Sequence, residues 1–205
     1  MNIREIWHNA RRPEPALTVS GWADKHRVRG TRASAEAGPW RTSRTPYLRE
    51  IMDCLSARSP VRKVVLMKGA QIGATECGAN WIGYVVHHAP GPMLAVQPTV
   101  EMAKRFSRQR LQQMVEDCPA LSERIAPARV RDSGNTVLSK EFAGGILVMV
   151  GANSPGPLRS MPVRYLFGDE VDAYPMAADK EGDPVNLAEV RTQTYGDGGR
   201  GKVFL

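Results

Sequence analysis

Apolar residues along the chain gather in short unbroken runs separated by longer amphipathic stretches. Runs of this kind cover residues 64–67, 93–96 and 163–168. Each run is too short for a helix, and the first is rich in β-branched residues, so all three predict buried strands. Residues 136–140 and 146–150, joined through a Gly-Gly turn, predict a hairpin, and residues 202–205 predict a last strand.

Helical patterns lie between these runs. Thr45 and Pro46 mark the start of a helix over residues 47–57, which Ser59-Pro60 ends. Thr99 is a candidate N-cap for a second helix, which reaches about Glu116. One face of that helix carries Ala103, Phe106 and Met114, and the opposite face carries Lys104, Arg105 and Arg108. Further helices are expected over residues 76–88 and 185–192.

Strands that alternate with helices predict an α/β fold with a largely parallel sheet. The 205 residues are enough for one good core, so we expect one main domain. Residues 8–46 are rich in Arg, Pro, Gly and small residues and show no sustained period, which indicates an extended arm. We therefore divide the chain into an arm over residues 1–45 and a folded domain over residues 46–205.

Composition excludes several classes of protein. No apolar run approaches the length of a membrane span, and arginines interrupt the first 20 residues, so neither a membrane protein nor a signal peptide is expected. The three cysteines are spaced too widely for a zinc site and suit free buried thiols. The net charge is +7, and residues 1–60 hold 11 Lys and Arg against 6 Asp and Glu. This excess is compatible with a polyanionic partner.

A glycine-containing loop follows the first apolar run. A phosphate-binding loop needs glycines, a helix behind them, a lysine and a hydroxyl for Mg²⁺, usually spaced as G-x-x-x-x-G-K-[ST]. Here Gly73 and Thr75 fit that spacing, but Ala74 stands at the lysine position and Lys68 stands at the entrance of the loop. A lysine at the entrance can reach the same phosphate oxygens, because the two ends of the loop lie close together. An ordinary strand-to-helix turn is the alternative.

Two carboxylates follow the apolar run at residues 163–168. Asp169 and Glu170 come at the predicted carboxyl end of a strand, the edge at which open α/β sheets bind ligands. In a nucleotide site, Asp169 suits the task of holding Mg²⁺ and Glu170 that of polarising the attacking water. Because the chain turns at the end of a strand, both side chains can face the loop. A solvated acidic strand end is the alternative interpretation.

Five segments together resemble one known family. They are residues 38–47, the loop from Lys68 to Thr75, Gln97-Pro98-Thr99, residues 153–160, and residues 166–172. The sequence is similar to the N-terminal ATPase region of the large terminase subunit of tailed bacteriophages, closest to the lambda-like branch. The resemblance implies an ASCE-type, RecA-like P-loop NTPase, built as a three-layer sandwich around a mostly parallel sheet.

The resemblance also implies the roles of individual residues. Lys68 would be the phosphate-binding lysine and Glu170 the catalytic carboxylate, while Thr75 and Asp169 would hold Mg²⁺. Tyr47 would lie in the adenine-binding stretch. The remaining ATP-binding positions are those of the loop itself: Gly69, Ala70, Gln71, Ile72, Gly73 and Ala74. Arg159, in a Gly/Pro-rich turn, is a further candidate for stabilising phosphate charge, with a solvated arginine as the alternative.

The implied function is hydrolysis of Mg-ATP to drive double-stranded DNA into an empty procapsid. The implied partners are a small terminase subunit and the portal, and a homo-oligomeric ring is expected for the full-length protein. The expected location is the bacterial host cytoplasm, with a transient stay on the procapsid. Large terminases also carry a coupling motif and a nuclease domain, which are expected to follow the strand at residues 202–205.

Two other functions fit the same sequence. Asp169-Glu170-Val171-Asp172 also matches the D-E-x-D pattern of superfamily-2 helicases, which predicts a helicase-like DNA translocase. Alternatively, the chain is a non-hydrolysing fragment whose basic first third binds DNA or a partner protein.

Overall fold

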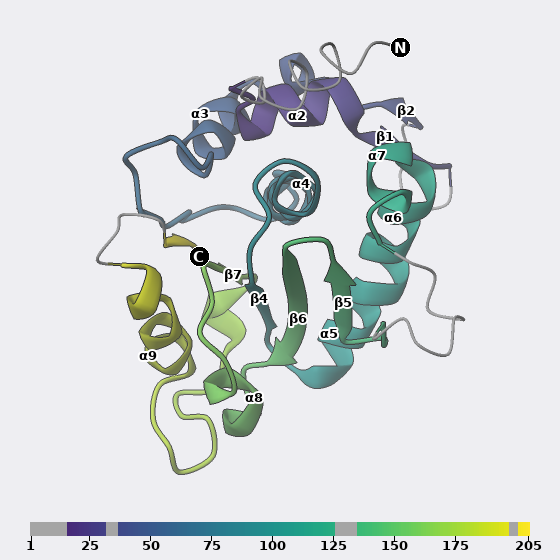
Figure 1. Ribbon diagram of the computed structural model, residues 1–205. Helices are drawn as coiled ribbons and strands as arrows, with labels where there is room; N and C mark the ends of the chain where they lie inside the picture. Colours follow the sequence, from purple (N-terminus) through teal and green to yellow (C-terminus); the bar gives the residue numbers. More distant parts are fainter. Residues whose placement is uncertain (1–15, 32–36, 126–134, 197–200) are drawn as a thin grey trace, which may run out of the picture.

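The computed structural model describes residues 16–31, 37–125, 135–196 and 201–205. A six-stranded sheet forms the centre of the molecule, and helices cover it on both sides (Figure 1). The strands follow the order β3, β8, β7, β4, β6, β5, and only β5 runs antiparallel to its neighbour. This arrangement confirms the predicted α/β fold with a mostly parallel sheet.

The strands form where the sequence pattern places them, with different lengths. Their bounds are β3 (Lys63–Val64), β4 (Met93–Gln97), β5 (Ser139–Phe142), β6 (Gly145–Gly151), β7 (Tyr165–Gly168) and β8 (Lys202–Phe204). The hairpin prediction is confirmed by β5 and β6, which turn at Gly144 with φ +87°. A separate ribbon pairs β1 (Val28–Arg29) with β2 (Gly38–Pro39).

Central strand β4 shows why these runs are continuously apolar. All five of its residues are buried, because the strand has a neighbour on each side and helices over both faces. Met93 and Ala95 belong to one hydrophobic cluster, and Leu94 and Val96 belong to the other. A strand covered on both faces cannot alternate apolar and polar residues.

The larger hydrophobic cluster lies under the longer helices. Helix α4 (Ala74–His87) packs between the sheet and the pair α2 (Val19–His26) and α3 (Tyr47–Cys54) (Figure 1). One continuous helical stretch follows β4, made of α5 (Val100–Phe106), a π-helical turn η2 (Ser107–Leu111) and α6 (Gln112–Asp117). It begins at Thr99, whose side chain accepts from the Met102 amide as predicted. Short helix α7 (Pro119–Ser122) follows.

The opposite side of the sheet is covered by shorter elements. These are α8 (Pro155–Arg159), α9 (Pro184–Glu189) and the 3-10 turns η3 (Val171–Ala173) and η4 (Val190–Tyr195). A further 3-10 turn, η1 (Thr42–Arg44), precedes α3. No helix among the described residues is both long enough and apolar enough to cross a membrane.

Three local expectations differ from the structure. Residues 19–26 form helix α2 instead of extended chain, because Val19, Trp22 and Ala23 make a short apolar face that is buried against α4. Thr45 does not cap α3, which starts after Pro46 without a side-chain cap. Residues 1–15 and 32–36 of the expected arm lie outside the described residues.

The expected buried strand at residues 64–67 is the third difference. Only Lys63 and Val64 pair as a strand, and the side chains of Val65 and Met67 are 67% and 98% exposed. The chain leaves the sheet after Val64, and the side chains of Val65 and Met67 line an open cavity at the edge of the sheet instead of packing in the core.

Candidate active site

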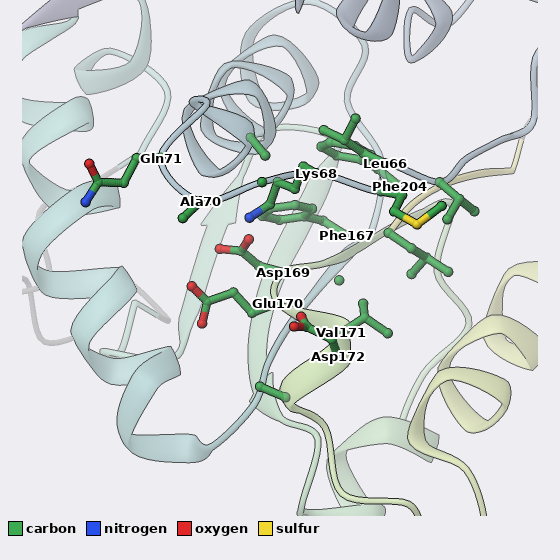
Figure 2. A pocket seen from close by; sticks show the side chains of 17 residues that line it. Leu66, Lys68, Ala70, Gln71, Phe167, Asp169, Glu170, Val171, Asp172 and Phe204 are labelled. Carbon is green, nitrogen blue, oxygen red and sulfur yellow. The ribbon is translucent and has the colours of Figure 1, made fainter.

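A cavity of about 630 Å³ opens at the carboxyl edge of the sheet (Figure 2). The ends of β3, β8 and β7 meet there, because these parallel strands point the same way. The lining is built from the segment after β3, the end of β7 with the turn that follows it, and the end of β8: residues 65–71, 74, 167–173, 204 and 205. The loop with Lys68 and the acidic pair therefore face the same space.

The loop between β3 and α4 contains two left-handed residues directly before a helix. Gln71 and Gly73 have φ of 59° and 87°. Left-handed residues of this kind occur in loops that turn backbone N–H groups toward an anion, and α4 adds the positive end of a 14-residue helix. In Figure 2 the Lys68 ammonium points toward Asp169, whereas the Gln71 side chain points away from both carboxylates.

Asp169 is buried, and two side chains donate hydrogen bonds to its carboxylate. It is 6% exposed, and its backbone N–H donates to the Val96 carbonyl at 3.0 Å. The Thr75 hydroxyl donates to Oδ1 at 3.3 Å, and the Gln97 amide donates to Oδ2 at 3.4 Å. The carboxylate is thus fixed from α4 on one side and from β4 on the other.

Glu170 has an exposed side chain and a strained backbone. Its φ and ψ are 53° and 49°, in the left-handed region that a glutamate rarely adopts. Strain of this kind collects at functional sites, where the surrounding structure holds it in place. The turn it makes at the end of β7 lets its carboxylate lie on the same side as that of Asp169, although the two residues are adjacent (Figure 2).

Tyr174 supports the acidic turn from below. Its hydroxyl donates to the Val96 carbonyl at 2.8 Å, the same oxygen that receives the Asp169 amide. Burial raises the pKa of Tyr174 well above its usual range, and the negative charge of Asp169 raises it further. The phenol therefore stays protonated and keeps the turn attached to β4.

The other candidate residues lie around the cavity or away from it. Tyr47 is 55% exposed, and its hydroxyl donates to the Ile72 carbonyl at 3.1 Å, so it braces the loop from outside the lining. Arg159, at the end of α8, forms an ion pair with Glu181 and is not part of the lining. The structure thus brings together Lys68, Thr75, Asp169 and Glu170, and it leaves Arg159 elsewhere.

Gln97 is the site residue that sequence reasoning missed. It stood in the segments that carry the family resemblance but was given no role. One signal was available: a polar residue at the end of a fully buried strand, on the same sheet edge as Asp169.

Known proteins match this chain over most of its length. Residues 34–203 match the family described as phage terminase large subunit gpA, ATPase domain. The terminase large subunit of Enterobacteria phage P21 is 30% identical over 185 residues, which is 88% of this chain and 28% of that protein. The terminase large subunit of Escherichia phage lambda is 25% identical over 183 residues, 89% of this chain and 28% of that protein.

One solved structure is also similar. The large terminase ATPase domain of Thermus phage P74-26 aligns with a TM-score of 0.49 at 14% identity, covering 85% of this chain and 70% of that one. The chain spans 28% of the length of the two curated relatives above. These matches offer no support for the helicase-like translocase or for a non-hydrolysing fragment.

Proposed function

The chain belongs to the family of phage terminase large subunit gpA ATPase domains, and from that premise we propose that it binds Mg-ATP in the cavity and hydrolyses it. The observation that carries this proposal is the contact between Thr75 and Asp169 beside Lys68. It unites a cation, a hydroxyl and a carboxylate at the positive end of α4.

The residues present fit a magnesium ion. Mg²⁺ prefers hard oxygen ligands and keeps several waters. The Thr75 hydroxyl and the Asp169 carboxylate already lie within hydrogen-bond distance of each other, and they come from the first turn of α4 and from the turn that follows β7. When bound, the metal would draw charge from the phosphate oxygens.

The chain's own residues would do the rest. Loop N–H groups and the Lys68 ammonium would bind the phosphates and fix their orientation. Glu170, beside Asp169 and exposed to the cavity, would accept a proton from the water that attacks the γ-phosphate. Tyr47 would help to position the adenine indirectly, since its hydroxyl is committed to the Ile72 carbonyl.

For the whole protein, we propose the role of a terminase large subunit, which is how the two relatives are named. The proteins from phages P21 and lambda are terminase large subunits. ATP hydrolysis in this chain would then drive double-stranded DNA into a procapsid, with a small terminase subunit and the portal as partners. The homo-oligomeric ring and the location in the host cytoplasm belong to the same proposal.

Nucleotide binding and turnover test the proposed chemistry. The measurements are the affinity for a fluorescent ADP analogue and the rate of phosphate release from Mg-ATP. We expect Lys68→Ala to weaken nucleotide affinity at least tenfold, and Glu170→Gln to keep the affinity but lose most turnover. Lys104→Ala is the matched control, because Lys104 is an exposed lysine that pairs with Glu101 on α5. A wild-type chain that binds no nucleotide would refute the proposal.

DNA binding is tested separately through its salt dependence. Arg105 and Arg108 are exposed on the continuous helix that starts at Thr99. If they contact phosphates, replacing each with alanine should reduce the slope of log affinity against log salt by about 0.9. Lys180→Ala, at an exposed lysine between η3 and α9 and outside the basic first third, serves as the control. A DNA affinity that does not change with salt would exclude this helix as a contact surface.

A further inference from the structure

Gln97 ends β4 directly behind the acidic pair. Its side chain is 3% exposed, and its amide nitrogen lies 3.4 Å from Asp169 Oδ2. We propose that Gln97 is a positioning residue, which holds the Asp169 carboxylate in the orientation needed to bind the metal of Mg-ATP. This inference rests on the proposed function, because it concerns the same metal and the same carboxylate.

The two donors to Asp169 are not equivalent. In the proposed site the Thr75 oxygen would itself be shared with the metal, so its hydrogen bond to Oδ1 is not an independent anchor. The amide nitrogen of a glutamine has no lone pair to offer a metal and acts only as a donor. Gln97 can therefore keep holding Oδ2 whether or not the metal is bound, and partners of this kind tune metal affinity.

The chemistry of the donor also matters. A lysine or arginine at position 97 would hold Asp169 equally well but would cancel the charge that attracts the metal. A neutral amide leaves that charge in place. Tyr174, another donor on this turn, is committed to the Val96 carbonyl. Among the described residues, Thr75 and Gln97 are the side chains with a hydrogen bond to Asp169.

The backbone of Gln97 is secured independently of its side chain. It lies opposite Gly151 in the parallel pairing of β4 with β6, and its carbonyl accepts from the Ala152 N–H at 2.8 Å. A side-chain substitution leaves these contacts intact. Gln97→Met, which has the same length and no donor, should therefore fold while releasing one oxygen of Asp169.

The test measures metal binding directly. Mn²⁺ is titrated into the 205-residue chain in the presence of ADP, and bound metal is followed by electron paramagnetic resonance. For Gln97→Met we expect the dissociation constant of Mn²⁺ to rise about tenfold or more. The affinity for the fluorescent ADP analogue without metal should stay within twofold of wild type. The midpoint of urea unfolding verifies that the variant is folded.

Two further variants make the result decisive. Gln97→Asn keeps an amide but is one methylene shorter, so it cannot reach Asp169 and should lose metal affinity in the same way. Gln112→Met is the matched control, because Gln112 also donates its amide to a carboxylate, that of Glu116, far from the cavity. Wild-type Mn²⁺ affinity in either folded Gln97 variant would overturn the positioning role alone. A wild-type chain that binds neither ADP nor Mn²⁺ would overturn the proposed function as well.

Discussion

Thr75 Oγ1 lies 3.3 Å from Asp169 Oδ1, although 94 residues separate the two in sequence. This contact joins the first turn of the helix behind the phosphate loop to the end of the acidic strand. Thr75 is neutral, so the contact is a hydrogen bond and not an ion pair. A hydroxyl beside a buried carboxylate is a pair of oxygen donors that one metal ion could share.

Thr75→Val keeps the shape of the side chain and removes its oxygen. We expect nucleotide affinity in the presence of Mg²⁺ to fall at least tenfold, with little change when Mg²⁺ is absent, and Thr75→Ser to restore most of the loss. Titration of the fluorescent ADP analogue with and without Mg²⁺ measures both. Thr18→Val is the control: it removes the N-cap of α2 and should cost about 1 kcal/mol of stability with no effect on the metal.

The left-handed backbone of Glu170 lowers the stability of the fold but directs the glutamate side chain toward the cavity. A left-handed backbone costs a non-glycine residue about 1 kcal/mol or more. Glycine removes this strain, but its greater freedom in the unfolded chain offsets part of the gain. We expect Glu170→Gly to raise the free energy of unfolding by roughly 0.5 kcal/mol while abolishing turnover. Urea unfolding and phosphate release are measured on the same preparations.

The matched control for that substitution is Asp179→Gly. Asp179 has a φ of 54° in an exposed loop away from the cavity. The Asp179→Gly variant should be more stable than wild type and keep its activity. A Glu170→Gly variant that is less stable than wild type would show that the glutamate side chain supports the turn, contrary to this interpretation.

Arg159 has to leave Glu181 before it can reach a nucleotide. Both side chains are partly exposed, and exposed ion pairs contribute about 0–1 kcal/mol to stability. Breaking the pair between Arg159 and Glu181 therefore costs little free energy. If Arg159 acts on phosphate, Arg159→Ala should lower turnover about tenfold, and Glu181→Gln should leave turnover unchanged or raise it. Equal losses of activity and melting temperature in the two variants would assign the pair a structural role instead.

The packing of α2 against α4 should make the free energy of unfolding depend on pH. Burial lowers the pKa of His26 below 6.5, and the positive charges of Lys25 and His88 lower it further. The unfolded chain therefore binds more protons than the folded chain just below pH 6.5, so the free energy of unfolding falls as the pH falls through this range.

The ring of His26 lies beside that of His87, whose Nδ1 accepts a hydrogen bond from the Trp22 indole at 3.2 Å. Urea midpoints at pH 5, 6 and 7 measure the slope. We expect the slope to decrease in His26→Gln, and an unchanged slope would place the titration elsewhere.

The sequence predicted the central elements well because their pattern is unambiguous. Strands β4 and β7 are continuously apolar, as strands covered on both faces must be, and α4 follows a glycine loop and ends near a Pro-Gly-Pro segment. Strand β3 was predicted too long, since the pattern of four apolar residues does not reveal that the chain leaves the sheet after Val64 and that Val65 and Met67 line the cavity. Helix α2 was missed because it is only eight residues long and its apolar face is short.

The residues of the candidate site also include some that the sequence predicted and some that it did not. Spacing and residue type led to Lys68, Asp169 and Glu170, which line one cavity, and to Thr75, which donates a hydrogen bond to Asp169. The partner of Arg159 was not predictable, because Glu181 lies in an irregular loop whose path depends on tertiary contacts. The sequence places Gln97 at the carboxyl end of a buried strand, but its contact with Asp169 follows only from the strand order, in which β4 and β7 are neighbours.

Strand β8 has a consequence for the order in which the site assembles. It lies between β3 and β7, and it is the strand partner of β3 among the described residues. The strand before the phosphate loop thus gains its place in the sheet only after residues 202–204 have been synthesised, some 140 positions downstream. Long-range parallel pairing of this kind forms slowly. Until it forms, Lys68 and Asp169 are not held next to each other, so the proposed nucleotide site stays incomplete in the nascent chain.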